Sequence, residues 1–180
     1  MALLTGLTID DFEQLPDAVA KNHDLVKGEL VDVSGNVFNH NRLRDGLVRK
    51  VGDYIDQHRL GYVVSEQEFE FGEDAYAPDV SFFGPEKARL IDGQLRVQRF
   101  VPDLVIEIAS KTDKFETLME KALHYQRHGV KEVYLFSIQL RQVFRYADQP
   151  TPTVLSDAQD FCPEQIPGFS IRIADLLAMI

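Results

Sequence analysis

The segment Leu104–Ala109, with the sequence LVIEIA, constrains the fold more than any other part of the chain. Apart from Glu107 it is apolar, and its apolar side chains occupy both alternating sets of positions. A strand of this kind needs cover on both faces, so it lies inside a sheet with helices packed on each side. We therefore expect 103–109 to be an inner strand of a mixed α/β layer fold, a central mixed sheet flanked by helices.

Two long helices are expected around this strand. Apolar residues recur at helical spacing over 40–60, which ends at Gly61, and over 114–128, which ends at Gly129. Thr112 or Asp113 is the expected cap of the second helix. The two helices should lie on opposite sides of the sheet, because the inner strand needs cover on both faces.

The remaining elements are shorter. Alternation predicts a strand over 24–33, with Gly28 at a bend. Short helices are expected at 8–15, with Thr8 as N-cap, and at 174–179. Further strands are expected at 62–71, 79–83, 94–100, 132–137, 141–146 and 169–173. We expect 62–71, 79–83 and 103–109 to be neighbours in the central sheet.

The length of 180 residues suits one domain, and the net charge of −10 is unevenly distributed along it. Residues 1–36 hold seven acids and two bases, and 147–180 hold five acids and one base. We therefore expect a single domain over 1–180 with an N-terminal extension (1–36), a core (37–146) and a C-terminal extension (147–180). The charge opposes tight non-specific binding to nucleic acid but leaves room for a local basic face.

Several classes of protein are excluded by what the sequence lacks. No apolar run could span a bilayer, and the acidic start does not resemble a signal peptide, so we expect a cytoplasmic protein without membrane contact. A single cysteine excludes an internal disulfide and a cysteine-built zinc site. No phosphate-cradling glycine loop or hydrolase elbow occurs. We interpret His124 and His128, four residues apart on a helix, as two solvated histidines.

Glu107 is the residue that points to chemistry. A carboxylate inside a buried strand costs several kcal/mol unless it is paired, protonated or bound to metal. Asp79 follows Pro78 at the start of another apolar strand, and two acids at neighbouring strand ends can hold a divalent cation. Lys121 flanks the apolar stripe of its helix and could supply a cation. The alternatives are a Glu107–arginine pair or an edge strand, a simple Pro-Asp turn, and a lysine that extends into water.

The sequence resembles the Uma family of restriction-endonuclease-like proteins in the PD-(D/E)XK nuclease superfamily. The matching stretches are LVKGELVDVS, APDVSFF, PDLVIEIAS, EKALHYQRHGVKEVYLF and PGFSIRIADLL. The resemblance implies a restriction-endonuclease-like core, in which Asp79 and Glu107 are the two motif acids. The superfamily lysine is expected two residues after the second acid, where this chain has Ala109; the resemblance assigns that role to Lys121 from the next helix.

The resemblance also implies supporting residues, a cofactor and partners. Candidate supporting residues are Glu29, His40, Ser110 and Tyr125, and Asp79, Glu107 and the Ile108 carbonyl would bind Mg²⁺ or Mn²⁺. The implied activity is metal-dependent endonuclease cleavage of DNA phosphodiester bonds, by a homodimer or higher homo-oligomer. A weak nucleic-acid patch is expected from basic residues of the first long helix, namely Arg42, Arg44, Arg49 and Lys50.

A second function class stays open at this point. The chain could be a non-catalytic or accessory protein that keeps the nuclease fold as a binding or structural module. The set of acids with Lys121 favours the nuclease, whereas the charge of −10 favours the accessory protein. A basic groove leading to Asp79 would favour the nuclease.

Overall fold

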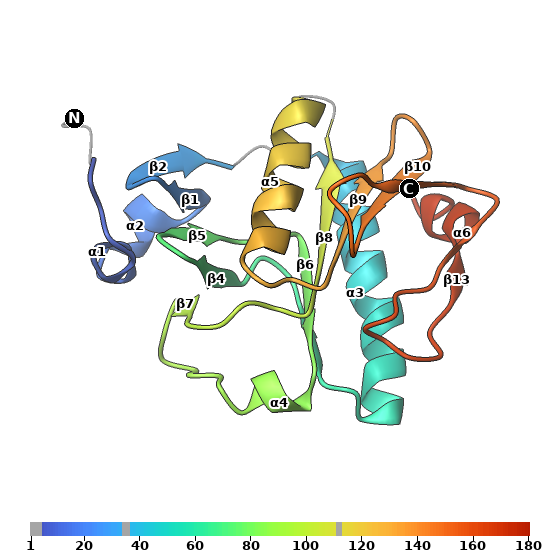
Figure 1. The fold of residues 1–180 in the computed structure, drawn as a ribbon, viewed down its shortest axis with the longest axis horizontal. Coiled ribbons are helices and arrows are strands. Elements are labelled where there is room, and N and C mark those ends of the chain that lie inside the picture. Colours follow the sequence, from blue (N-terminus) through green and yellow to red (C-terminus); the bar gives the residue numbers. More distant parts are fainter. Residues whose placement is uncertain (1–4, 34–36, 111–112) are drawn as a thin grey trace.

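A six-stranded mixed sheet forms the centre of the computed structural model, which describes residues 5–33, 37–110 and 113–180 (Figure 1). Its strand order is β11-β10-β9-β8-β6-β3. The strands are β3 (Tyr62–Val64), β6 (Val80–Phe83), β8 (Leu104–Ala109), β9 (Glu132–Ser137), β10 (Gln142–Tyr146) and β11 (Thr153–Ser156). Only β8 and β9 pair in parallel, which makes the sheet mixed as predicted.

The inner strand β8 is covered on both faces, as its apolar sequence predicted. Leu104, Ile106 and Ile108 belong to the same hydrophobic cluster as the buried side of α3 (Phe38–His58). Val105, on the opposite face, packs in a second cluster with α5 (Phe115–Arg127). Figure 1 shows β8 running between these two helices. The predicted placement of the long helices on opposite sides of the sheet is therefore confirmed.

A second sheet of five short strands lies at the N-terminal end of the molecule, in the order β2-β1-β5-β4-β7 (Figure 1). Its strands are β1 (His23–Val26), β2 (Glu29–Asp32), β4 (Glu68–Phe71), β5 (Asp74–Tyr76) and β7 (Val97–Gln98). The short helices α1 (Ile9–Glu13) and α2 (Asp17–Ala20) pack against it through a small separate cluster that includes Phe12 and Leu25. The predicted cap of α1 is present, because Thr8 and Asp11 form a capping box.

The predicted single strand over 24–33 is wrong, because the chain reverses there into the β1–β2 hairpin. Lys27 and Gly28 both adopt positive φ, 52° and 76°, as a two-residue hairpin turn requires. A Cβ at Gly28 would lie 3.0 Å from the Cα of Gly6, so the position also lacks room for a side chain. Glycine is therefore required by the turn rather than by a bend.

The predicted strand over 62–71 is also wrong as one element. The chain leaves the central sheet after β3 and enters the second sheet at β4, with Glu66 at positive φ (53°) between them. The expected neighbourhood of strands holds for β3, β6 and β8 alone. The strand expected at 94–100 shrinks to the two residues of β7.

The C-terminal part of the chain packs onto the central sheet. Its elements are β12 (Asp160–Phe161), β13 (Ile171–Arg172) and α6 (Ile173–Leu177), and Phe161 and Ile173 join the cluster that contains α3. The remaining element, α4 (Pro85–Ala88), follows β6. Within the described ranges, none of the helices has the length and apolar character needed to cross a membrane.

Candidate active site

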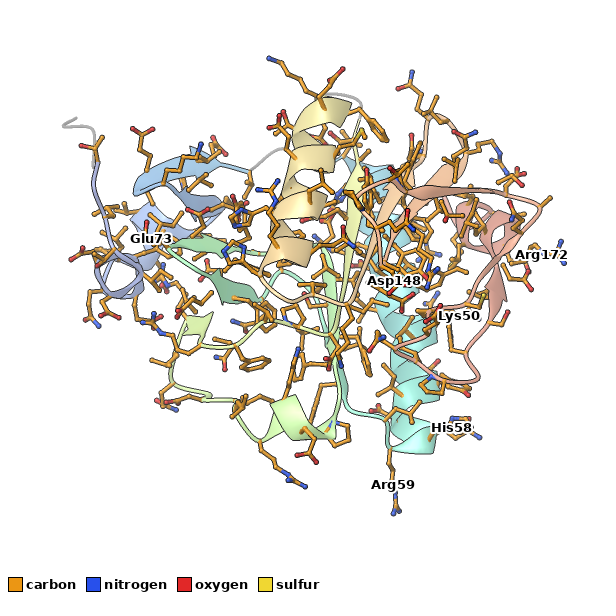
Figure 2. All side chains as sticks on the ribbon, in the orientation of Figure 1. Lys50, His58, Arg59, Glu73, Asp148 and Arg172 are labelled. Atoms are coloured by element: carbon orange, nitrogen blue, oxygen red, sulfur yellow. The ribbon has the colours of Figure 1, made fainter. Side chains whose placement is uncertain are left out.

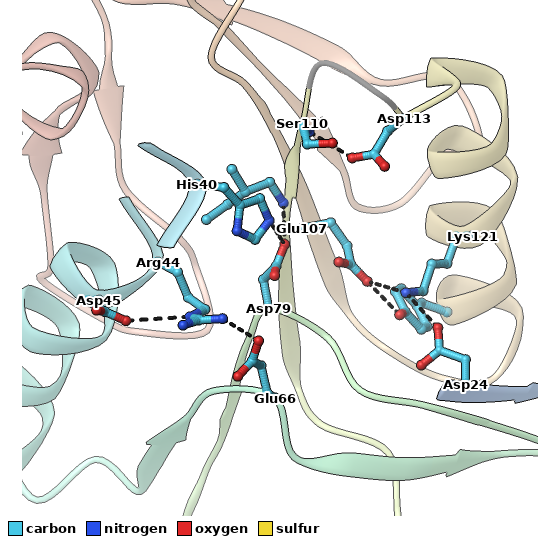
Figure 3. Close-up of polar contacts among 12 residues, drawn as sticks. Asp24, His40, Arg44, Asp45, Glu66, Asp79, Glu107, Ser110, Asp113 and Lys121 are labelled. Carbon is cyan, nitrogen blue, oxygen red and sulfur yellow. Dashed lines mark hydrogen bonds and ion pairs between the residues drawn. The ribbon is translucent and has the colours of Figure 1, made fainter. Parts of the chain in front are cut away.

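Asp79 lies where β6 begins, beside the middle of β8. The antiparallel register pairs Val80 with Ile106, so one step further Asp79 lies opposite Glu107. The backbone N–H of Ile108 donates to Asp79 Oδ2 at 2.7 Å, and His40 Nε2 lies 3.0 Å from the same oxygen (Figure 3). His40 comes from the first turn of α3 and is buried. A strand and a helix therefore fix one oxygen of this carboxylate.

Glu107 projects from the face of β8 that packs against α5 and is 5% exposed. Its Oε1 accepts a hydrogen bond from the Tyr125 hydroxyl at 2.6 Å and lies 3.1 Å from Lys121 Nζ. Burial raises the pKa of Glu107 to about 7, against the opposing charge of Lys121; the nearby Asp79 carboxylate raises it further. This carboxyl group therefore changes its charge near neutral pH.

Lys121 reaches inward from α5 instead of extending into water. Its Nζ lies 3.1 Å from both Glu107 Oε1 and Asp24 Oδ2, and 5.1 Å from the ring centroid of Tyr76. Burial alone would lower the pKa of the Lys121 amine, but the two carboxylates raise it above its usual value. The group is therefore an ammonium ion held between two acids, and its side chain is only 17% exposed.

Asp24, on β1, is a member of the cluster that sequence reasoning missed. It is 3% exposed, and its Oδ1 accepts the backbone N–H of Ala77 at 3.0 Å while Oδ2 pairs with Lys121. Glu29, the predicted acid of this region, is exposed beside the hairpin turn and does not join these contacts. Glu107 is identified in the sequence as a carboxylate among apolar strand residues. Asp24 shows the same pattern once β1 is recognised as a strand of the hairpin.

Of two other predicted supporting residues, Tyr125 joins the cluster and Ser110 lies at the end of β8. The Tyr125 ring is fully buried between α5 and the sheet, and its hydroxyl contacts Glu107. Ser110 directly follows β8, and its backbone N–H donates to Asp113 Oδ2 at 2.7 Å (Figure 3). The helix cap is Lys114, not Asp113, and Thr112 lies outside the described residues.

The sequence profile of the Uma2 family, described as "Putative restriction endonuclease", matches residues 9–174. The chain belongs to the Uma2 family. It is also similar in structure to a crystal structure of "a putative nuclease belonging to DUF820 from Anabaena variabilis ATCC 29413", with a TM-score of 0.83, 96% of this chain and 98% of that chain covered, and 22% sequence identity. This likeness confirms the predicted restriction-endonuclease-like fold. No protein with a curated description matches the sequence.

The four basic residues of α3 in this Uma2 chain do not form the single cationic surface that was expected. Arg44 is 14% exposed and is held by Glu66 and Asp45. Arg42 donates to the Met179 carbonyl at 3.3 Å. At 100° per residue, Arg44 lies on the opposite side of α3 from Arg42, whereas Arg49 and Lys50 lie on the Arg42 side, so only Arg44 falls outside the predicted patch.

Arg49 and Lys50 remain exposed, but they lie about 14 Å beyond His40 along the helix axis at 1.5 Å per residue. Asp53 and Asp56 are exposed on the same part of the helix. Figure 2 shows Lys50 part-way along α3, whereas His58 and Arg59 lie at its far end. The outer face of α3 therefore carries mixed charge.

His124 is not simply solvated, which corrects the interpretation from the sequence. Its Nε2 lies 3.3 Å from Asp74 Oδ2, and its ring packs edge-on against Phe71 and Tyr76. Burial and the neighbouring His128 lower the pKa of His124. His128 is exposed, as expected.

The donor atoms of the Uma2 site suit a hard divalent cation. Asp79 Oδ1 and Glu107 Oε2 accept no hydrogen bond within the described part of the chain, so each has an oxygen available. With Asp24 and Lys121 the cluster carries a charge of −2 when all four are ionised and His40 is neutral. In residues 5–33, 37–110 and 113–180 no three His, Cys, Asp or Glu side chains are arranged to enclose a metal. Mg²⁺ commonly binds through one or two carboxylates and otherwise keeps water or substrate ligands, so this open donor set fits it.

Proposed function

We propose that this Uma2 chain is a divalent-metal-dependent nuclease that hydrolyses phosphodiester bonds of DNA. The observation that carries the proposal is that the buried Asp79 accepts the Ile108 N–H, directly beside Glu107 on β8, and that Glu107 pairs with Lys121 of α5. Two carboxylates with available oxygens beside a buried ammonium group suit a reaction at a phosphate. Membership of a family described as restriction endonucleases supports the same reading.

Each side chain has a distinct task in the proposed reaction. Asp79 and Glu107 would hold Mg²⁺ or Mn²⁺, which when bound polarises the phosphodiester and makes water more acidic. The Ile108 N–H and His40 keep Asp79 oriented, and the Tyr125 hydroxyl keeps Glu107 oriented. Lys121 supplies a fixed positive charge where negative charge develops on the phosphate, and a preorganised group of this kind loses little energy in reorganising.

The partners belong to the proposal as well. The ligand is DNA, and we expect a homodimer or higher homo-oligomer because two sites are needed to cut both strands of a duplex. Light scattering coupled to size-exclusion chromatography would measure the assembly. We also expect the protein in the cytoplasm, which fractionation of the source cells would test.

A metal titration with a nucleic-acid panel tests the function. Plasmid DNA, single-stranded DNA and RNA are incubated with the protein and Mg²⁺, Mn²⁺ or chelator. We expect cleavage of DNA that requires metal, that Asp79→Ala abolishes, and that Lys121→Met abolishes while metal binding persists. Cleavage that survives Asp79→Ala would remove the assigned site, and preferential cleavage of RNA would replace the substrate.

The accessory-protein alternative is favoured by one observation: Arg42 and Arg44 are held by intramolecular contacts, and the exposed bases of α3 are mixed with acids. Such a protein would bind metal or nucleic acid without turnover. Calorimetric metal binding by a preparation that cleaves nothing in the panel would support that alternative.

A further inference from the structure

The Asp24 carboxylate connects three parts of the molecule. It stands on β1 in the N-terminal hairpin, accepts the backbone N–H of Ala77 with Oδ1, and contacts Lys121 of α5 with Oδ2. Ala77 precedes Asp79 by two residues on the segment between the two sheets. A single buried side chain therefore ties the Asp79 segment to the lysine, and Figure 3 shows its contact with Lys121.

The position of a lysine ammonium group depends strongly on the groups that contact it. The ammonium group is a point charge on a flexible four-carbon stem, so its position depends on its partners. Here Nζ lies 3.1 Å from each of Asp24 and Glu107, near the Tyr76 ring. With Glu107 as its only acidic partner, the ammonium would neutralise the carboxylate that the divalent metal ion needs. With Asp24 as a second acidic partner, the ammonium divides its attraction between two carboxylates.

We propose that Asp24 is a positioning residue, which shares the Lys121 ammonium with Glu107 so that the lysine faces the phosphate and Glu107 stays available to the metal. This inference rests on the proposed nuclease function and deepens it. It makes the N-terminal hairpin a component of the active site, because β1 supplies the group that aims the lysine.

Asp74 offers a matched control on the neighbouring strand β5. It is 7% exposed, and its Oδ1 accepts the backbone N–H of Lys27 at 2.7 Å. Its Oδ2 lies 3.3 Å from the imidazole of His124. Asp24→Asn and Asp74→Asn therefore remove equivalent buried charges and keep an oxygen for the backbone N–H. Only the first of them changes a contact of Lys121.

The experiment compares wild type, Asp24→Asn, Asp24→Glu and Asp74→Asn by steady-state DNA cleavage, by melting temperature, and by the ¹H–¹⁵N signal of the Lys121 ammonium, assigned from its loss in Lys121→Met. We expect Asp24→Asn to lower kcat about tenfold or more with KM changed less than about twofold, the pattern of a lost transition-state interaction. It should also displace or broaden the Lys121 signal. Asp74→Asn should melt similarly to Asp24→Asn but keep turnover and the signal.

The outcomes separate the two proposals. If the wild type cleaves nothing, the proposed nuclease function is wrong. The positioning role is tested separately by the Lys121 signal, and it is wrong if Asp24→Asn leaves that signal unchanged. A wild-type kcat in Asp24→Asn, or an equal loss in Asp74→Asn, also overturns it. If Asp24→Asn does not fold, Asp24→Glu decides, because it moves the charge by one methylene: wild-type kcat and signal there would contradict positioning.

Discussion

Glu107 is an almost completely buried carboxyl group, and burial disfavours its charged form. Burial raises its pKa to about 7, so a proton and a divalent cation compete for it across the neutral range. With its pKa raised this far, the ionised fraction of Glu107 grows as the pH rises from 6 to 8. We expect the apparent Mg²⁺ affinity of the wild type to rise by up to about tenfold between those pH values.

Isothermal titration calorimetry at pH 6, 7 and 8 would measure this rise. Glu107→Gln serves as the control, because it removes the titrating group and should bind weakly with little pH dependence. If the Mg²⁺ affinity of the wild type stays constant from pH 6 to pH 8, Glu107 is not a ligand of the metal.

Glu68, on β4, shows the same effect. Burial raises its pKa to about 7 although Arg96 opposes the shift, the charge of Asp24 adds to the shift, and Glu68 Oε2 has no hydrogen-bond partner among the described residues. Because the folded pKa exceeds the unfolded value of 4.5, folding favours the protonated carboxyl group. The protonated group's contribution to the free energy of unfolding is complete below about pH 4.5 and is lost as the pH rises through 7. We expect Glu68→Gln to raise the melting temperature at pH 8 and to leave it nearly unchanged at pH 4.5. Equal shifts at both pH values in thermal melts would contradict the assignment.

The elements of the site depend on one another through side chains such as Tyr125, which joins α5 to β8. Tyr125→Phe keeps the buried ring and removes the hydroxyl that donates to Glu107 at 2.6 Å. We expect a loss of about 0.5–1.5 kcal/mol in the free energy of unfolding, because Glu107 Oε1 loses one hydrogen bond but keeps Lys121 as a partner. Urea denaturation measures it.

Tyr134→Phe is the matched control for that variant, since its hydroxyl donates to Glu132 at 3.1 Å, away from the site. It should lose comparable stability and keep wild-type Mg²⁺ affinity. Tyr125→Phe should weaken that affinity, because burial of Glu107 is then less compensated. If both variants bind Mg²⁺ equally well, Tyr125 contributes to the fold alone.

The elements also explain what could be predicted from the sequence. The positions of α3 and α5 follow from their long apolar periodicity, and that of β8 from its nearly continuous apolar run, because both patterns depend on neighbours in the sequence. The hairpin was missed because Lys27-Gly28 is not one of the usual Asn-Gly or Asp-Gly turn pairs. Asp24 was missed as a consequence, since its partner Lys121 is far away in the sequence and only the assembled sheets bring them together.

At the scale of the whole molecule, Glu132 ties the C-terminal segment to the central sheet. This buried acid accepts from Arg145 at 2.9 Å and from the backbone N–H of Gln165 at 2.9 Å. We expect Arg145→Gln to cost about 3–5 kcal/mol in the free energy of unfolding, because it leaves Glu132 buried without its cation. Arg172→Gln breaks an exposed pair with Asp160 and should cost less than about 1 kcal/mol. Similar losses in the two variants, measured by urea denaturation, would exclude a special role for the buried pair.

The outer strand of the smaller sheet, β2, has one side on which the described residues place no neighbouring strand. Val31, 43% exposed, stands on this strand between the exposed acids Glu29 and Asp32. An open strand edge with an exposed apolar residue invites edge-to-edge association with other chains, and charged residues on the edge oppose it. Glu29 and Asp32 therefore place negative charge along this edge, which opposes its pairing with the β2 edge of a second copy. Acid and high salt weaken that repulsion.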